Sequence, residues 1–262
     1  MVMTFTRRAA CELVSRLARL GAEPVAAGTI HATAMRLLEL FWSVKGISRP
    51  AILSNPERFV LEAAGLSHPG YDSAALVREI QWASARAVGP ESYPEALSHA
   101  QRLPAVEASM VQEVYSKYQK LKAARNVVDV DDLPGLVVQA MREPAFAGSV
   151  RWRFRHFLVD EAQDLSRSQW RMIRCLVGDG ADIFMVGDPD QAIYGWNGAD
   201  ACFLTELKRI FPAATTFELR TNYRCAPVVL SSSISLLGPR TAPRCSTGVL
   251  ESRDDPGSFT CR

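Results

Sequence analysis

Two acidic segments, each placed directly after an apolar run, carry the residues of this 262-residue sequence that are best suited to chemistry. The run 157–159 ends in Asp160 and Glu161, and the run 183–186 is followed by Gly-Asp-Pro-Asp and then Gln191. Adjacent carboxylates at the end of a strand suit the binding of Mg²⁺ and the activation of an attacking water. A strand that leads into an acidic helix start would contain the same residues, because negative charge is favourable at a helix N-terminus. Taken alone, the segment leaves both interpretations open.

Aromatic and basic side chains follow these acidic segments. Tyr194 and Trp196 lie between glycines in a predicted loop, where exposed rings suit stacking on nucleic acid bases. Arg224 follows the end of a predicted strand, and its planar guanidinium suits a terminal phosphate. For each of these residues alone, a structural role is at least as good an explanation as a functional one. Aromatic residues pack in protein cores, and an arginine commonly forms an ion pair at the surface.

The segments around these residues alternate between two periodicities. Short apolar runs predict strands at 2–5, 25–29, 154–159, 183–186 (buried) and 215–219. Apolar residues at helical spacing predict helices at 6–20 (capped by Thr6), 32–42, 166–176, 199–210 and 227–237. Strands that alternate with helices in this way predict an α/β fold with a parallel sheet covered on both faces.

Residues 46–125 depart from this alternation, because prolines divide helical segments there and strand signals are few. The clearest of these helices has charged residues, including Lys122, on one face and an apolar stripe on the other, formed by Val106, Met110, Val114, Tyr118 and Leu121. We therefore predict an all-helical insertion in the α/β domain. Residues 238–262 are rich in Pro, Gly, Ser, Thr and Arg, which predicts a disordered tail.

Composition narrows the class of protein. A chain that is 48% hydrophobic and 22% charged is globular. No run approaches the roughly 18 apolar residues of a membrane span, and no basic region precedes the short apolar start, so we expect no membrane partner and a cytoplasmic location. Six cysteines without a C-x-x-C pair and four scattered histidines indicate reduced thiols without metal-ligand spacing. The net charge of +2 means that nucleic acid binding would depend on local placement of charge.

In their order along the chain, these segments resemble the motifs of the UvrD/Rep-type superfamily 1 DNA helicases. FLVDEAQD at 157–164, VGDPDQAIYGWNGAD at 186–200 and LRTNYR at 219–224 resemble motifs II, III and IV. MTFTRRAACEL at 3–13, TIHATAMRLL at 29–38 and VDVDDL at 128–133 resemble motifs Ia, Ib and Ic. The resemblance covers roughly 1–45 and 126–237, and residues 46–125 fall where the family inserts a helical subdomain.

The resemblance implies an ATP-driven 3′-to-5′ translocase on single-stranded DNA that unwinds DNA in repair or recombination. The implied fold is a RecA-like P-loop NTPase motor domain, formed by 1–45 and 126–225, with the helical insertion at 46–125 and the start of a second motor domain at 226–237. By motif, Asp160 would hold Mg²⁺, Glu161 would activate water, and Gln191 and Arg224 would contact the γ-phosphate of ATP. The resemblance also implies that the path of the single DNA strand is lined by Phe5, Tyr194 and Trp196. It implies that Thr29 and His31 lie near the DNA phosphates.

The sequence departs from the family's pattern at several points. It contains no G-x-x-x-x-G-K-[ST] phosphate loop, the family's motif I, and motifs V and VI are absent after residue 237. Asn197 stands where the family usually has arginine, and Ala162 where it usually has an aromatic residue. From these departures we expect an incomplete sheet, a helicase fragment truncated at both ends, weak or absent binding of ATP and Mg²⁺, and negligible ATP hydrolysis by the isolated chain.

Two alternatives to a helicase fragment stay open. One is a non-catalytic module that binds single-stranded DNA or a partner, such as a complementing polypeptide that carries the missing motifs. The other is the product of a broken gene. A metal-dependent nuclease built on Asp160, Glu161 and Asp164 is a weaker reading, because nuclease carboxylates usually come from separated elements, whereas these adjoin on one turn.

Overall fold

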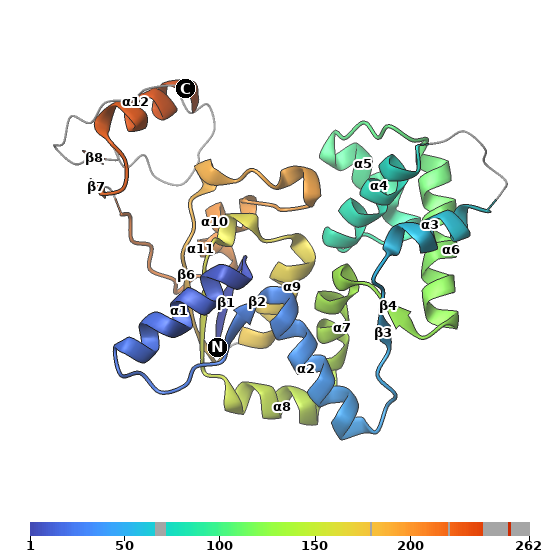
Figure 1. Ribbon diagram of the computed structural model, residues 1–262, viewed down its shortest axis with the longest axis horizontal. Helices are drawn as coiled ribbons and strands as arrows, with labels where there is room; N and C mark the ends of the chain where they lie inside the picture. The colour runs from blue at the N-terminus through green and yellow to red at the C-terminus, as the bar shows by residue number, and fades with distance from the viewer. Residues whose placement is uncertain (66–71, 179, 220, 238–250, 253–262) are drawn as a thin grey trace. The chain divides into compact units, whose positions relative to one another are not determined.

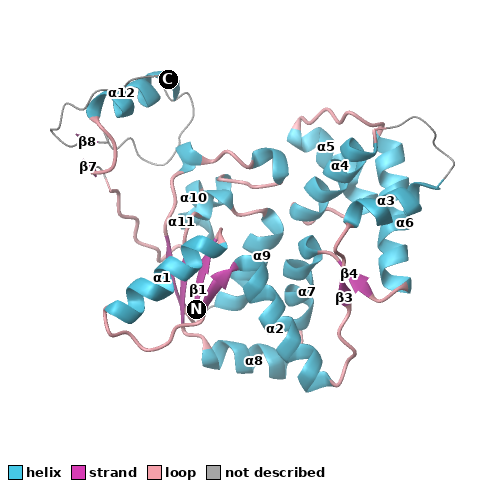
Figure 2. Ribbon diagram, viewed as in Figure 1, coloured by secondary structure: helices cyan, strands magenta, loops and turns pink. Residues whose placement is uncertain are grey.

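The computed structural model describes residues 1–65, 72–178, 180–219, 221–237 and 251–252 (Figure 1). The chain divides into two compact units, Met1–Asp188 with Ala192–Ala201, and Pro189–Gln191 with Cys202–Arg262, and each is described by itself. Helices predominate, and the strands are short (Figure 2). Among the described residues, no helix combines the length and the apolar character that crossing a membrane requires.

A parallel sheet forms the centre of the first unit, with the strand order β2-β1-β5-β6. The strands are β1 (Val2–Thr4), β2 (Ala27–Thr29), β5 (His156–Val159) and β6 (Asp182–Met185). Met3 pairs with Gly28 on one side and with Val159 on the other, and Phe157 pairs with Ile183. Because these strands run parallel, the segments that follow them meet at one edge of the sheet. The α/β fold class with a parallel sheet is thereby confirmed.

In the part of the chain that the structure describes, five helices accompany the sheet: α1 (Arg7–Arg19), α2 (Ile30–Lys45), α7 (Leu133–Ala140), α8 (Pro144–Arg153) and α9 (Arg167–Val177). Three of them, α1, α2 and α9, begin at a residue whose side chain caps the helix. Thr6 Oγ1 accepts the Ala9 N–H at 3.1 Å, as predicted for this cap, and Gly21 follows the helix with a φ of 74°. Ser166 and Gln169 form a reciprocal capping box at the start of α9.

One face of the sheet is covered and the other is open at β5 and β6. Phe157 and Val159 are buried, whereas the alternate residues Leu158, Phe184 and Val186 are exposed, Phe184 by 60%. This alternation follows from the two-residue period of a strand. The predictions of a buried strand at 183–186 and of a sheet covered on both faces are therefore wrong for this face, because no described element covers Leu158 and Phe184 there.

A helical region with its own core occupies the chain between α2 and α7. It contains α3 (Pro56–Ala64), α4 (Ser73–Ala85), the 3₁₀ turn η2 (Pro90–Ser92), α5 (Tyr93–Ala100) and α6 (Ala108–Ala124). Leu76, Tyr93 and Val114 are among the residues that fill this core. A short parallel pair, β3 (Ala51–Ile52) with β4 (Val127–Val128), was not part of the predicted all-helical insertion.

Helix α6 differs from its prediction on one face. Val114 and Tyr118 are buried, as the apolar stripe indicates. Lys122, which the sequence placed on the charged outer face, is only 3% exposed. It lies inside because it forms ion pairs with Asp129 and Asp132, and buried lysines are found almost only when they are paired.

The second unit contains short elements. They are η5 (Pro189–Gln191), α10 (Cys202–Thr205), α11 (Leu207–Ile210), β7 (Thr221–Asn222), α12 (Pro227–Leu237) and β8 (Glu251–Ser252). The bounds of α12 are as predicted, whereas the helix predicted at 199–210 is two short helices. The strand predicted at 215–219 is wrong: Phe217 and Leu219 are exposed, and alternating apolar residues form a strand only where a neighbour pairs with their backbone. Apart from β8, which pairs with β7, the predicted tail 238–262 lies outside the described residues.

Candidate functional site

The turn after β5 holds the acidic residues at the carboxyl edge of the sheet. The Asp160 N–H donates to Met3 O at 3.0 Å, and the Ala162 N–H donates to Val186 O at 2.9 Å. These bonds tie the turn to β1 and to the residue after β6. Between them, Glu161 adopts a left-handed backbone with a φ of 53° and keeps its side chain exposed. A non-glycine residue in this conformation costs free energy and persists where its surroundings hold it.

Gln163 connects the Glu161 carboxylate to the segment after β6. Gln163 is buried in the 3₁₀ turn η4 (Ala162–Asp164). Its Nε2 donates to Glu161 Oε2 at 2.8 Å, and its Oε1 accepts the Asp188 N–H at 3.1 Å. Because both ends of the amide are engaged, Gln163 orients the Glu161 carboxylate. From the sequence, an amide two residues after paired carboxylates indicates further polar contacts, but the bond to Glu161 is visible only in the structure.

Asp164 is buried beside this turn, and its Oδ1 has no hydrogen-bond partner in the described part of the chain. Burial, together with the negative charge of Glu161, raises the pKa of Asp164 above its usual value. A buried acceptor without a donor costs free energy. Asp164 is therefore the least satisfied polar group of the acidic turn.

The carboxylates of the turn fit part of a nucleotide site. Mg²⁺ beside a nucleotide takes one or two protein carboxylates, with water and phosphate as its other ligands, and Asp160 suits that role. The described residues contain no group of three or more His, Cys, Asp or Glu side chains that could hold a metal ion unaided. The backbone cradle and lysine of a phosphate loop have no counterpart anywhere in the sequence. The sequence thus contains the carboxylates of a Mg²⁺–nucleotide site but not the phosphate-binding loop.

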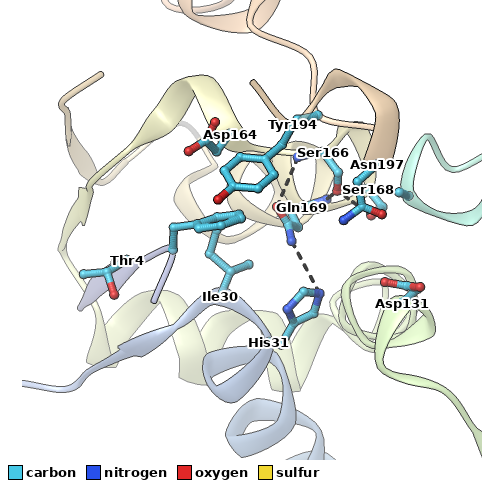
Figure 3. Close-up of a pocket in the computed structure, with 13 residues that line it drawn as sticks. Thr4, Ile30, His31, Asp131, Asp164, Ser166, Ser168, Gln169, Tyr194 and Asn197 are labelled. Carbon is cyan, nitrogen blue, oxygen red and sulfur yellow. Dashed lines mark hydrogen bonds between the residues drawn. The ribbon is translucent and has the colours of Figure 1, made fainter. Parts of the chain in front are cut away.

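A cavity of about 140 Å³ lies at the same edge of the sheet (Figure 3). Phe5, which follows β1, and Tyr194 line it with their ring centroids 5.0 Å apart. The ring of Trp196 lies 6.5 Å beyond that of Tyr194, and this side chain is 63% exposed. The structure thus brings Phe5, from the segment after β1, into contact with the loop that carries Tyr194 and Trp196, and the three rings form one aromatic surface.

Thr29 and His31 lie at the start of α2, and His31 lines the cavity (Figure 3). Thr29 Oγ1 accepts the Ala32 N–H at 3.2 Å and so caps the helix. The N-terminus of a helix this long attracts phosphate through its free N–H groups and its dipole. Burial lowers the pKa of His31, so the imidazole is neutral near pH 7. Any contact with phosphate here would use neutral donors and the dipole of α2.

A cluster of three aspartates and one lysine adjoins the cavity. Asp129 and Asp132 form a capping box around the 3₁₀ turn η3 (Val130–Asp132). Lys122 Nζ, from α6, donates to Asp129 Oδ2 at 2.9 Å and to Asp132 Oδ2 at 2.6 Å, and the Tyr118 hydroxyl donates to Asp129 at 2.7 Å. Asp131 lines the cavity, where burial and the two neighbouring aspartates raise its pKa to about 7. The cluster fastens the helical region to a wall of the cavity.

The loop that carries Tyr194 and Trp196 packs against helix α4. Gly198 ends the 3₁₀ turn η6 (Gly195–Asn197) with a φ of 85°, and a Cβ at this position would lie 2.6 Å from the Cβ of Ala85. Asp200 Oδ2 lies 3.5 Å from Arg86 Nη2 and 3.5 Å from Arg167 Nη2. The helical region and α9 therefore both position the aromatic loop.

Gln191 and Arg224, which the sequence resemblance assigns to the γ-phosphate, belong to the second unit. Gln191 is exposed at the end of η5. Arg224 is exposed in a turn where Asn222 Oδ1 accepts the N–H groups of Arg224 and Cys225. The roles of these two residues stay predictions. The other predicted site residues all lie in the first unit.

The fold and the site together define a class of protein. A parallel sheet that carries paired carboxylates and an aromatic cavity at the carboxyl ends of its strands is typical of α/β proteins that bind their ligands at this edge. Within this class, the chain belongs to the UvrD/REP helicase N-terminal domain family, whose model matches residues 1–212.

The chain is similar to several curated DNA helicases. ATP-dependent DNA helicase UvrD2 of Mycobacterium tuberculosis is 37% identical over 247 residues, which cover 88% of this chain and 35% of that protein. ATP-dependent DNA helicase UvrD1 of Mycobacterium leprae is 29% identical over 259 residues, 90% of this chain and 33% of that protein. ATP-dependent DNA helicase PcrA of Leuconostoc citreum is 28% identical over 248 residues, 90% of this chain and 32% of that protein. This chain spans about a third of the length of these relatives.

Proposed function

We propose that this chain supplies the single-stranded DNA contacts and the catalytic carboxylates of an ATP-dependent 3′-to-5′ DNA helicase that acts in repair or recombination. The observation that carries the proposal is the cavity formed by Phe5, His31 and Tyr194 beside the acidic turn of Asp160 and Glu161. The names of the relatives, which are ATP-dependent DNA helicases, support the same activity. We also propose that the protein works in the cytoplasm.

On the DNA side, aromatic rings hold bases and the start of α2 holds the backbone. Phe5, Tyr194 and Trp196 offer ring faces, and stacking on such faces contributes about 1–3 kcal/mol for each base regardless of its identity. Thr29 and His31 sit at the positive end of α2, where a phosphate is favoured. A motor that moves along any sequence needs this tolerance for the identity of the base.

On the nucleotide side, Asp160 would hold the Mg²⁺ that accompanies ATP, and bound Mg²⁺ supplies positive charge to the phosphates. Glu161, oriented by Gln163, would take the proton of the attacking water. Gln191 and Arg224 would contact the γ-phosphate, where Arg224 stabilises its negative charge.

For the isolated 262-residue polypeptide we propose weak ATP and Mg²⁺ binding and negligible hydrolysis, since no phosphate loop occurs in its sequence. The measurement is ATP hydrolysis with and without oligothymidylate, in the parent chain and in Glu161→Gln. Hydrolysis that DNA stimulates and that Glu161→Gln abolishes would contradict this proposal. Under the alternative function, a non-catalytic DNA-binding module, the same chain binds DNA and Glu161→Gln changes nothing.

The open side of the sheet favours a complementing segment, carried either by a longer form of this protein or by a second polypeptide. Among the described residues, the backbone of edge strand β6 pairs with β5 alone. Leu158, Phe184 and Val186 expose apolar surface on the same strands. A parallel strand followed by a helix would pair with this edge and cover this face.

Tryptophan fluorescence tests the DNA-binding proposal. We expect oligothymidylate at low salt to quench the emission of the parent chain, with weaker quenching as salt rises. Trp196→Phe should remove most of the quenching. Trp152→Phe is the matched control, because Trp152 is 77% exposed in α8 and does not line the cavity, so its loss should leave the quenching intact. A folded chain that shows no quenching at low salt would refute DNA binding by the cavity.

A further inference from the structure

Gln169 reaches His31 from a position that fixes the orientation of its amide. Gln169 is buried in the first turn of α9. Its Oε1 accepts the Ser166 N–H at 3.1 Å as one half of the capping box. Because Gln169 Oε1 accepts this bond, the other end of the amide, Gln169 Nε2, faces His31 Nε2 at 3.4 Å (Figure 3).

This contact selects one form of the imidazole. An amide nitrogen can only donate, so His31 Nε2 accepts, and the proton of the neutral ring lies on Nδ1. An imidazolium has no accepting nitrogen, and the contact therefore disfavours protonation of the ring. The burial of His31 acts in the same direction and lowers its pKa.

We propose that Gln169 is a positioning residue for His31: it holds the neutral Nδ1–H form, so that His31 offers Nδ1–H as a donor to a DNA phosphate. The proposal rests on the proposed function for its ligand, but its first test needs no DNA. Helix α9 starts directly after the acidic turn that ends at Asp164. The contact thus joins the segment that carries the catalytic carboxylates to the segment that faces DNA.

Other titratable groups face the same cavity and enter its pH dependence. Asp131 comes from η3, Asp164 from η4 and Tyr194 from the aromatic loop. The pKa values of both aspartates are raised, and that of Asp131 reaches about 7, so Asp131 carries only part of its negative charge near neutral pH. No lysine or arginine is among the described residues that line the cavity, so a phosphate bound by this lining would depend on neutral donors such as His31 Nδ1–H.

Nuclear magnetic resonance of the full chain with ¹⁵N-labelled histidine tests the proposal directly, since the sequence has four histidines. In the parent chain we expect one histidine, assigned through His31→Gln, to titrate below the ordinary range and to carry its proton on Nδ1. A His31 that titrates with an ordinary pKa, or that carries its proton on Nε2 when neutral, would overturn the proposal.

Two variants separate positioning from folding. In Gln169→Glu the carboxylate still accepts the Ser166 N–H but now also accepts from His31, so the pKa of His31 should rise and its proton should move to Nε2. Ser166→Ala is the control: it removes the Ser166 Oγ cap on the Gln169 N–H, keeps the Ser166 N–H, and should lower stability while leaving the His31 tautomer unchanged. A His31 that responds equally to both variants would overturn the positioning role.

Binding of labelled oligothymidylate gives the second readout. Gln169→Met and His31→Ala should each weaken binding about three- to tenfold, and the double variant should weaken it no further than the stronger single variant. Additive losses would overturn the proposal. If the parent chain binds no DNA, the proposed function fails, while the histidine spectra still decide whether Gln169 sets the form of His31.

Discussion

The aromatic cavity and the acidic turn lie at one edge of the same sheet, but they differ in how well their polar groups are satisfied. Around the cavity, Gln169, Asp200 and Lys122 each bond to groups from other segments. In the acidic turn, Glu161 has a strained backbone, and Asp164, where the turn meets the cavity, keeps a buried oxygen without a partner in the described part of the chain.

This difference separates two kinds of site. The cavity is held by packing and ion pairs between the sheet, α9 and the helical region, so its shape belongs to the fold itself. The acidic turn holds its carboxylates in positions that cost free energy, which is typical of sites whose ligands supply the compensating interactions. We therefore expect substitutions around the cavity to act mainly on stability and DNA binding, and substitutions in the turn to cost little stability.

The largest effect is expected from Lys122→Met. This change leaves Asp129 and Asp132 buried without their cation, and should lower the free energy of unfolding by about 3–5 kcal/mol. Urea denaturation measures it. Lys117→Met is the matched control on the same helix, because the Lys117 ion pair with Glu113 is exposed and should contribute little. A loss below about 1 kcal/mol in Lys122→Met would mean that the cluster does not hold the cavity wall.

A smaller effect is expected from Gly198→Ala. The added Cβ would lie 2.6 Å from the Cβ of Ala85, on a backbone with a φ of 85°. The variant should therefore lose about 2 kcal/mol of stability. It should also bind oligothymidylate more weakly, because the aromatic loop would have to shift. Gly148→Ala is the control, since its Cβ would meet open space in α8 and should stabilise the helix slightly. Unchanged stability in Gly198→Ala would show that the loop does not depend on its contact with α4.

Asp131 should make stability depend on pH. Its pKa is raised from 3.8 to about 7 in the folded chain, so the folded state binds more protons than the unfolded state between these values. Stability should therefore fall as pH rises from about 4 to about 7 and then level off. Asp131→Asn should remove this fall and gain up to about 4 kcal/mol over the parent at pH 8, with little gain at pH 4. Parallel stability curves for the two chains would contradict the raised pKa of Asp131.

The smallest effect is expected in the acidic turn, from Glu161→Asn. Asparagine tolerates the left-handed backbone better than glutamate, but its shorter side chain gives up the acceptor of the buried Gln163 amide, so the two effects oppose each other and the change in the free energy of unfolding should stay within about 1 kcal/mol. Glu12→Asn, on the right-handed helix α1, should instead lose stability, because asparagine is a poorer helix former and the Arg16 pair disappears. A loss of more than about 2 kcal/mol in Glu161→Asn would mean that the relief of backbone strain does not offset the lost Gln163 hydrogen bond, and the contrast between the two sites would fail.

Much of the first unit was predictable, because its signals are local. The cap at Thr6, the helix start at Ser166 and the parallel strands depend on neighbouring residues and on apolar runs. The prediction at 215–219 failed because its alternation of Phe217 and Leu219 needs a pairing strand, which local sequence does not reveal. Lys122 was placed outside for the same kind of reason, since its partners Asp129 and Asp132 follow in a different element.

The sequence by itself determined the order of the motifs, the α/β class and the types of residue available for chemistry, because these depend on periodicity and on side-chain identity. Only the tertiary structure decided that Phe5, His31, Gln169 and Tyr194 share one cavity, and that Gln163 orients Glu161. Such contacts join residues from separate elements, and their geometry arises only when the parallel strands bring their carboxyl ends to one edge of the sheet.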